Sequence, residues 1–300
     1  MIRHLFGRWV FAVLTGLLMV PTASAQSVTI STLEKIRSYR TIYVGHREAS
    51  IPFSYLVGDE AVGYSMDLCD RVVEAVKDAV DDPALRVVRV PVTSSSRMLM
   101  LLVGAIDLEC GSTTNTKIRQ HQVAFGVSTF VSGIRAAVRK DTGINRLADL
   151  DGKVVVTTAG TTTERVVRTV MATRNASARF KSARDHAESL AIVVSRQADT
   201  FVMDDAILAG LLANSPDADK LKLLDENFGF EPYGIVMRKE DPEFKKLVDE
   251  TLKGLMKNGE LEKIYHKWFM SPIPPKNVNL RIPMSDTLKE LIRNPNDSGI

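Results

Sequence analysis

The chain has 300 residues, of which 45% are hydrophobic, and its 39 Lys and Arg oppose 36 Asp and Glu, a formal net charge of +3 at pH 7. A chain of this length and composition can bury a substantial core, and it often divides into two lobes. The nearly balanced charge does not indicate a nucleic-acid partner, because proteins that bind nucleic acids carry a strongly basic surface.

The first 25 residues have the pattern of a secretory signal peptide. A short basic start precedes an apolar run over residues 9–20, and Ala23-Ser24-Ala25 supplies small residues for cleavage. We therefore expect an exported protein that is cleaved after Ala25. A retained membrane anchor is the alternative, but the run is short for a bilayer and no Cys follows it for lipidation. No later segment reaches the roughly 20 apolar residues that a membrane span needs.

Predicted strands and helices alternate after this segment. In chain order we expect a strand over 41–45, a helix over 65–80, a strand over 86–92, a helix after Ser94 to Ser96, and a strand over 105–110. This alternation is typical of a parallel sheet flanked by helices.

The chain has two cysteines. Cys69 lies on the apolar stripe of the helix predicted over 65–80, and Cys110 ends the strand predicted over 105–110. In an oxidising compartment a Cys69–Cys110 disulfide is plausible, and two buried free thiols are the alternative. The histidines show no metal-ligand spacing, so we expect no metal site.

The segment from Asp107 to Arg119 passes from a buried strand through a glycine into a hydroxyl-rich loop and then a helix start. A helix N-terminus has unpaired N–H groups and a partial positive charge, Ser112 and Thr114 add hydroxyl donors, and Arg119 adds a two-pronged cation. These features favour a cradle for a carboxylate. An ordinary capped strand-to-helix turn is the alternative.

A second segment has the same design. The β-branched strand over 154–157 leads through Gly160 to Thr161 and Thr162 at a helix start. Thr161 and Glu164 fit a capping box, which makes Glu164 structural. Two such cradles suggest one ligand held between two lobes.

The remaining elements form a second α/β unit and a C-terminal extension. We expect strands near 154–157, 180–183 and 200–203, a late strand over 233–237, a helix that begins at Asp241-Pro242, a short helix over 261–269 and an amphipathic piece over 287–292.

Two arginines occupy positions that suggest an anion. Arg97 falls in the first turn of a predicted helix, where a cation is electrostatically disfavoured unless it binds something. Arg47 follows a strand, at the edge where α/β sheets bind ligands. The alternatives are a solvated surface arginine at 97 and a surface pair between Arg47 and Glu48.

His186 and Asp204 also follow predicted strands. A lone histidine is more often structural than functional, and Asp204 can hold an ammonium group, cap a helix, or do both. Enzyme signatures are missing, because 63–67 lacks the last glycine of a nucleophile elbow and 254–259 lacks the Lys and Ser or Thr of a phosphate loop. We expect no catalytic residue and no cofactor.

With these residues in view, the chain resembles the periplasmic glutamate/aspartate-binding proteins of amino-acid ABC transporters, within the family-3 extracellular solute-binding proteins. The resemblance covers nearly the whole chain after the signal peptide. The matching stretches are 44–55, 63–65, Thr93-Ser94 with Arg97, 109–115, 159–162, Asp185-His186, 203–206, and 267–269 with 272–277.

The resemblance implies an α/β, two-lobed periplasmic binding protein fold of type II, each lobe a mainly parallel sheet flanked by helices. Two hinge crossings are expected near 129–133 and 230–234. The signal peptide would be 1–25, lobe 1 would comprise 26–129 and 234–300, and lobe 2 would comprise 130–233.

The resemblance also assigns side chains to the polar groups of an amino-acid ligand. Arg119 is expected to bind the α-carboxylate with help from Ser112, Thr114 and Thr162, with Thr161 as a neighbouring candidate. Asp204 is expected to bind the α-ammonium group. The side-chain carboxylate is expected among Arg47, Ser94, Arg97 and His186. Three arginines and one aspartate would give the site a charge of +2, which suits an acidic ligand.

The implied function is a non-enzymatic periplasmic protein that captures L-glutamate or L-aspartate by lobe closure. It would deliver the ligand, as a monomer, to an inner-membrane ABC permease with its ATPase. A periplasmic enzyme of the same fold, of the cyclohexadienyl or arogenate dehydratase type, is an alternative, because its substrate also carries a carboxylate. A broader specificity that includes glutamine and asparagine, or a sensor role, are the others.

Overall fold

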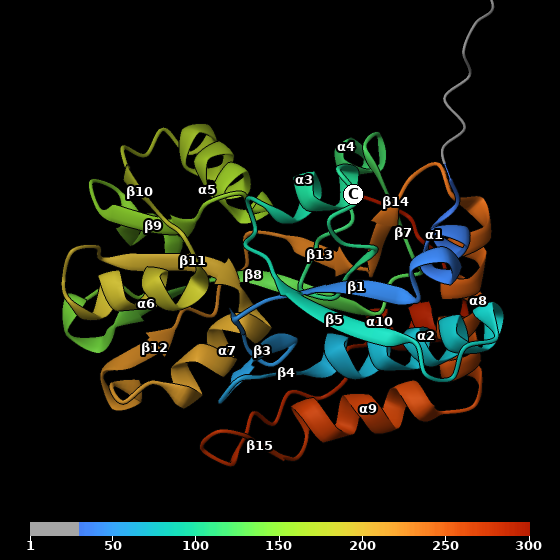
Figure 1. Ribbon diagram of the computed structural model, residues 1–300. Coiled ribbons are helices and arrows are strands. Elements are labelled where there is room, and N and C mark those ends of the chain that lie inside the picture. The colour runs from blue at the N-terminus through green and yellow to red at the C-terminus, as the bar shows by residue number, and fades with distance from the viewer. Residues whose placement is uncertain (1–29) are drawn as a thin grey trace, which may run out of the picture. The chain divides into compact units, whose positions relative to one another are not determined.

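Two β-sheets organise residues 30–300, the part of the chain that the computed structural model describes (Figure 1). The five-stranded sheet has the order β5-β1-β6-β14-β7, and the six-stranded sheet has the order β10-β9-β11-β8-β12, with β13 paired to β8. The predicted signal peptide and its cleavage site lie outside the described residues. None of the helices within residues 30–300 is long and apolar enough to cross a membrane.

The five-stranded sheet mixes parallel and antiparallel pairs. Its strands are β1 (Thr41–His46), β5 (Arg86–Pro91), β6 (Leu108–Glu109), β7 (Val123–Phe125) and β14 (Val236–Arg238). β1 runs parallel to β5 and β6, as the alternation of elements predicts, whereas β14 pairs antiparallel with β6 and β7. A late segment of the chain therefore completes the first sheet.

The six-stranded sheet is also mixed. Its strands are β8 (Phe130–Arg139), β9 (Val154–Thr158), β10 (Arg179–Ala183), β11 (Thr200–Asp204), β12 (Leu221–Leu223) and β13 (Phe230–Tyr233). β9, β10 and β11 are parallel, and the long strand β8 is antiparallel to β11, β12 and β13. We call the five-stranded sheet with its helices lobe 1 and the six-stranded sheet with its helices lobe 2; the expected residue bounds of the two lobes stay a prediction.

Helices accompany both sheets. They are α1 (Thr32–Tyr39), α2 (Tyr64–Val80), α3 (Arg97–Leu102), α4 (Lys117–Gln120), α5 (Thr162–Thr173), α6 (His186–Val194), α7 (Asp205–Asn214), α8 (Pro242–Lys257), α9 (Glu260–Phe269) and α10 (Asp286–Arg293). Short 3-10 turns span Lys140–Thr142, Leu147–Leu150 and Ala218–Lys220. Small sheets are formed by β2 (Ala49–Ser50), β3 (Ser54–Val57) and β4 (Glu60–Val62), and by β15 (Pro272–Ile273) and β16 (Val278–Asn279).

The sequence explains where the long helices begin and which face they bury. In α2 the apolar positions recur at helical spacing, and Cys69, Val72, Val76 and Val80 are buried. α8 begins with proline at its first position, and the Asp241 carboxylate accepts a hydrogen bond from the backbone N–H of Phe244 at 3.1 Å.

Two predicted strands differ from the structure. The strand predicted over 233–237 is wrong as one element, because the chain passes from β13 in lobe 2 to β14 in lobe 1 at Gly234 and Ile235. The strand predicted over 105–110 is reduced to Leu108–Glu109, since Ala105 still closes the end of α3 through a hydrogen bond to the Met100 carbonyl.

The chain passes between the sheets twice, and the two passages lie side by side. Phe130 of β8 pairs with Tyr233 of β13, and the Thr129 N–H donates to the Tyr233 carbonyl at 2.9 Å. Buried aromatic rings pack around this pair, with centroids 4.7 Å apart for Phe53 and Phe130 and 5.0 Å for Phe130 and Phe269. The crossing strands are therefore held by backbone pairing and by aromatic packing.

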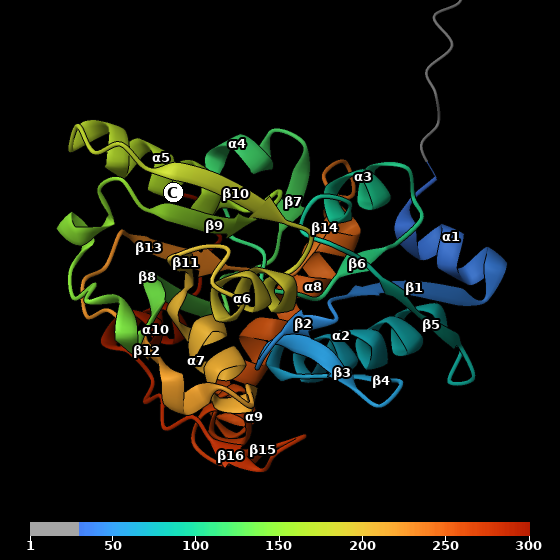
Figure 2. The ribbon, with the colours of Figure 1, turned by 90° about the vertical axis from the view of Figure 1, so that its left-hand side faces the viewer.

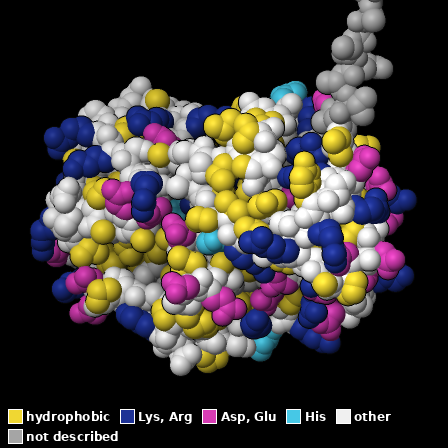
Figure 3. All heavy atoms as spheres, in the orientation of Figure 1, with side chains coloured by type: hydrophobic (Ala, Val, Ile, Leu, Met, Phe, Trp, Pro, Cys, Tyr) yellow, Lys and Arg dark blue, Asp and Glu magenta, His cyan; other side chains and the backbone are white. Residues whose placement is uncertain are grey.

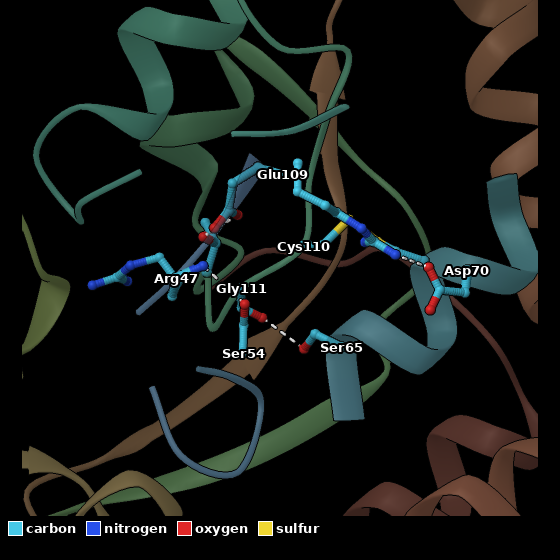
Figure 4. Close-up of a disulfide and its surroundings, with 10 residues drawn as sticks. Arg47, Ser54, Ser65, Asp70, Glu109, Cys110 and Gly111 are labelled. Atoms are coloured by element: carbon cyan, nitrogen blue, oxygen red, sulfur yellow. Dashed lines mark hydrogen bonds and ion pairs between the residues drawn. A yellow bond between two sulfur atoms is a disulfide. The ribbon is translucent and has the colours of Figure 1, made fainter. Parts of the chain in front are cut away.

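A Cys69–Cys110 disulfide joins α2 to the end of β6, with the Cα atoms 6.2 Å apart (Figure 4). This confirms the predicted pairing and excludes two free thiols. Ser65 strengthens the same junction, because its hydroxyl donates to the Gly111 carbonyl at 2.7 Å. The disulfide thus anchors the loop that begins at Gly111.

The last residues of the chain pack against the next part of that loop. The Lys117 N–H donates to the Ile300 carbonyl at 3.0 Å, and the Ile300 N–H donates to the Asn115 carbonyl at 3.2 Å. The loop from 111 to 119 is therefore held by the disulfide at one end and by the C-terminal residues at the other. On the face shown in Figure 3, basic and acidic side chains are intermixed rather than segregated.

Candidate functional site

Arg47 and Arg97 are both buried, each with 2% of its surface exposed. Arg47 follows β1 and Arg97 is the first residue of α3. The alternatives of a solvated Arg97 and of a surface Arg47–Glu48 pair are therefore wrong. Two guanidinium groups buried near each other need anions to offset their repulsion.

Glu109 is one such anion, and the sequence analysis missed it. It is fully buried in β6, and its Oε1 lies 3.9 Å from Nη1 of Arg97. Thr113 donates its hydroxyl to Oε2 of Glu109 at 2.5 Å. Figure 4 shows the Glu109 carboxylate beside Arg47, whose guanidinium points away from the disulfide. The available signal was its place at the end of a strand, the same feature that singled out Arg47.

The pKa of Arg47 shows that placing its guanidinium group beside that of Arg97 is electrostatically unfavourable. Burial, followed by the charge of Arg97, lowers the pKa of Arg47 to about 9, although Glu109 acts in the opposite direction. The surroundings thus disfavour the charged form of Arg47, and an additional anion beside the two arginines would stabilise that form.

Arg119 reaches from lobe 1 toward lobe 2. Its Nη1 donates to the Thr114 carbonyl at 2.8 Å, and its Nη2 donates to the Gly160 carbonyl at 3.3 Å. Burial, followed by the charge of Arg97, lowers the pKa of Arg119 to about 10. α4 has four residues, so the first cradle depends on Arg119 and the loop hydroxyls more than on a helix N-terminus.

The two cradles meet at their threonines. Oγ1 of Thr114 lies 3.1 Å from Oγ1 of Thr162, which connects the two lobes. Thr161 is the N-cap of α5: its hydroxyl accepts from the Glu164 N–H at 3.3 Å and donates to the Thr158 carbonyl at 2.7 Å. Only this half of the predicted capping box forms: the Thr161 N–H donates to the Thr158 carbonyl at 3.4 Å, and the Glu164 side chain pairs with Arg168 at 3.3 Å.

Asp204 is buried at the end of β11 and makes no side-chain cap to α7. It accepts hydrogen bonds from the Tyr233 hydroxyl and from Thr163, the latter at 3.2 Å. Burial, followed by the charge of Glu231, raises the pKa of Asp204 well above its usual range. A cation beside Asp204 would remove this penalty.

Glu231 is a second acid that the sequence analysis missed. It is 1% exposed in β13, and its Oε2 accepts from the Thr114 hydroxyl at 2.5 Å. The sequence signal was a charged residue within a predicted crossing segment. With Glu109 and Glu231, the site holds three acids against three arginines, so the expected count of a single aspartate is wrong.

His186 begins α6, and its Nδ1 lies 2.8 Å from the hydroxyl of Thr158. Burial lowers the pKa of His186 well below its usual range, and the charges of Arg47 and Arg97 lower it further. The ring is therefore neutral at pH 7, and it lies within the field of the two arginines that it was expected to join.

Several buried polar atoms of these residues have no hydrogen-bond partner among residues 30–300. They are Nε and Nη1 of Arg47, Oγ of Ser94, Nε of Arg97, Oε1 of Glu109, Oγ of Ser112, Nε2 of His186 and Oε1 of Glu231. Burying an unpaired polar atom costs about 1–3 kcal/mol, so a concentration of them indicates a binding site for a polar ligand. Across residues 30–300, no group of three or more His, Cys, Asp or Glu side chains is placed to hold a metal ion.

Comparison with known proteins agrees with this geometry. The family model of bacterial extracellular solute-binding proteins, family 3, matches residues 42–271. The L-glutamate/L-aspartate-binding protein of Pseudomonas aeruginosa is 45% identical over 290 residues, covering 96% of this chain and 95% of that protein. A glutamate/aspartate import solute-binding protein of Salmonella typhimurium is 44% identical over 271 residues, covering 90% of each.

Solved structures show the same fold. An ancestral arginine-binding protein bound to arginine superposes with a TM-score of 0.69 at 29% identity, covering 76% of this chain and 98% of that one. The fold is thus that of the two-lobed, type II periplasmic amino-acid-binding proteins, as expected. The curated relatives are binding proteins and not enzymes, which supports a non-enzymatic function over the dehydratase alternative.

Proposed function

Because the chain belongs to family 3 of the bacterial extracellular solute-binding proteins, we propose that it captures L-glutamate and L-aspartate between its lobes for an ABC importer. The partners would be an inner-membrane permease and its ATPase, and the compartment would be the periplasm, where a disulfide such as Cys69–Cys110 persists. The chain would act as a monomer, since its own two lobes supply every residue assigned to the ligand.

The buried arginine cluster carries this proposal. Arg47 and Arg97 bring two positive charges to one end of the site, and Glu109 brings one negative charge. The remaining +1 matches one carboxylate. The side chain of glutamate or aspartate would neutralise it, whereas the amide of glutamine would leave a buried charge uncompensated.

The other end of the site suits the groups that all amino acids share. Arg119, with Ser112, Thr114 and Thr162, would bind the α-carboxylate. Asp204 would bind the α-ammonium group, which would offset the repulsion that raises its pKa. Ser94 and His186 would contact the side-chain carboxylate beside Arg47 and Arg97, while Thr161 would keep the second cradle in shape through its cap.

A thermal-shift screen of the common amino acids tests this proposal. The protein is first unfolded, dialysed and refolded, so that no ligand is carried over from its source. A ligand present at 100 times its Kd stabilises the folded state by about 2.7 kcal/mol, which corresponds to a rise in Tm of about 5–10 °C. We expect this rise with glutamate and aspartate. A rise with neither, or a larger one with a basic amino acid, would contradict the proposal.

A further inference from the structure

The backbones of the two lobes touch at two glycines of lobe 2. A Cβ atom added to Gly210, in α7, would lie 2.5 Å from the carbonyl oxygen of Ile51 and 2.8 Å from its carbonyl carbon. A Cβ atom added to Gly160, before α5, would lie 2.7 Å from Cα of Ser95. The opposing atoms are backbone, so they cannot rotate away as a flexible side chain could.

The Gly160 contact adjoins the polar contacts across the site, and the Gly210 contact is a second approach between the same two lobes. Arg119 donates to the carbonyl of Gly160, and Thr114 lies against Thr162. The turn at Ile51 joins β2 to β3 and is tied to α2 of lobe 1, because the Tyr64 N–H donates to the Pro52 carbonyl at 2.9 Å, and Figure 2 shows α7 next to β2. The glycine contacts therefore lie where the lobes close on each other.

The two glycines differ in backbone conformation. Gly160 has a φ of +77°, a left-handed conformation that itself favours glycine. Gly210 lies inside α7, where its φ is not in that region, and alanine is preferred over glycine in a helix interior. The local fold of α7 thus gives no reason for glycine at 210, whereas the approach of Ile51 does.

We propose that Gly210 is a closure residue: the missing side chain lets α7 lie against the Ile51 turn, and tight ligand binding depends on that approach. This inference rests on the proposed function. Ordinary van der Waals contact begins at 3.4 Å, so a methyl group at 210 would displace the two backbones by about 0.9 Å from their 2.5 Å approach. Ligand bonds made from both lobes would lengthen, because each needs a donor–acceptor distance near 3 Å.

The test compares Gly210→Ala with a matched control, Gly254→Ala. Gly254 lies inside α8, also without a positive φ, and a Cβ atom there has no neighbour within 4 Å. Both substitutions improve helix propensity equally. Titration calorimetry with L-glutamate gives the affinity, and thermal unfolding of the ligand-free protein reports the fold.

We expect both variants to keep or exceed the ligand-free Tm of the wild type. We expect Gly210→Ala to bind glutamate about tenfold or more weakly, since a loss of 1.4 kcal/mol is a factor of ten, and Gly254→Ala to bind as the wild type does. An unchanged affinity in Gly210→Ala would overturn the inference. A fall in its ligand-free Tm would overturn it too, because Gly210 would then serve the fold and not closure. If the wild type gave no heat with glutamate, the proposed function itself would fail.

Discussion

In the proposed site, Arg97 would distinguish an acidic side chain from an amide by charge and not by size. It lies beside Glu109, and its charge lowers the pKa of both Arg47 and Arg119, so it acts on the whole site. An anion bound next to it would relieve repulsion among the guanidinium groups of Arg47, Arg97 and Arg119. An uncharged ligand side chain would relieve little of the repulsion among these arginines.

Replacing Arg97 with Ala should therefore weaken acidic ligands selectively. A hydrogen bond to a charged group contributes about 1.5–3 kcal/mol, so glutamate should bind roughly 10- to 150-fold more weakly. Glutamine should lose much less, and titration calorimetry with both ligands measures the difference. Arg119→Ala is the comparison, because it should weaken both ligands together. Equal losses for glutamate and glutamine in Arg97→Ala would refute this division of roles.

Asp204 should reduce the stability of the ligand-free protein at neutral pH. Its pKa is raised by burial and by Glu231, so above the usual value of 3.8 the folded state binds more protons than the unfolded state. The free energy of unfolding therefore falls as the pH rises from about 3.8 through the raised pKa. An asparagine at this position has the same shape but cannot ionise, so it would remove this pH-dependent loss of stability.

We expect ligand-free Asp204→Asn to be more stable than the wild type at pH 7, with the difference shrinking toward pH 4. Urea unfolding at several pH values measures it, and glutamate binding should be weakened in the same variant. A stability difference that stays constant with pH, or that favours the wild type at pH 7, would show that Asp204 is not the group responsible.

At the scale of elements, the loop after β6 is held at both of its ends. The disulfide fixes Cys110 to α2, and residues 115–117 pair with Ile300 at the C-terminal end. Ser112 and Thr114 lie between these anchors. Their positions thus depend on a covalent bond and on backbone pairing, whereas Arg119 lies in the one-turn helix α4.

The disulfide closes a loop with a sequence separation of 41 residues. By the chain-entropy model, a loop of this length stabilises the folded state by about 4 kcal/mol. Reduction should lower the free energy of unfolding by about that amount, as urea denaturation with and without dithiothreitol would show. A Cys69→Ser/Cys110→Ser variant should be insensitive to the reductant. An unchanged midpoint in wild-type protein, with two free thiols detected, would contradict this account.

The elements also show how far the sequence could be read. The two cradles were predictable because glycine and hydroxyl residues follow β-branched strands, and α2 was predictable from its apolar spacing. The break between β13 and β14 was not, since nothing in residues 233–237 tells one sheet from another. Glu109 and Glu231 were missed for a related reason: buried acids look like surface acids until the opposing arginines and threonines are placed around them.

At the scale of the whole molecule, neither lobe would hold the complete proposed site. Lobe 1 supplies Arg47, Arg97 and Arg119, and lobe 2 supplies His186 and Asp204. A ligand that contacts both sets stabilises the closed arrangement by its differential affinity for it. Two passages of the chain would permit such closure without breaking either sheet, since the strands of each sheet pair within that sheet and the passages lie side by side at Phe130 and Tyr233.

The central claim is that the site selects a ligand with two carboxylates and one ammonium group. Its most direct test is titration calorimetry of the refolded wild-type protein with L-glutamate and L-glutamine at pH 7, since the two ligands differ in charge but hardly in size. We expect glutamate to bind at least about tenfold more tightly, a difference of 1.4 kcal/mol or more. Equal affinities, or tighter binding of glutamine, would contradict it.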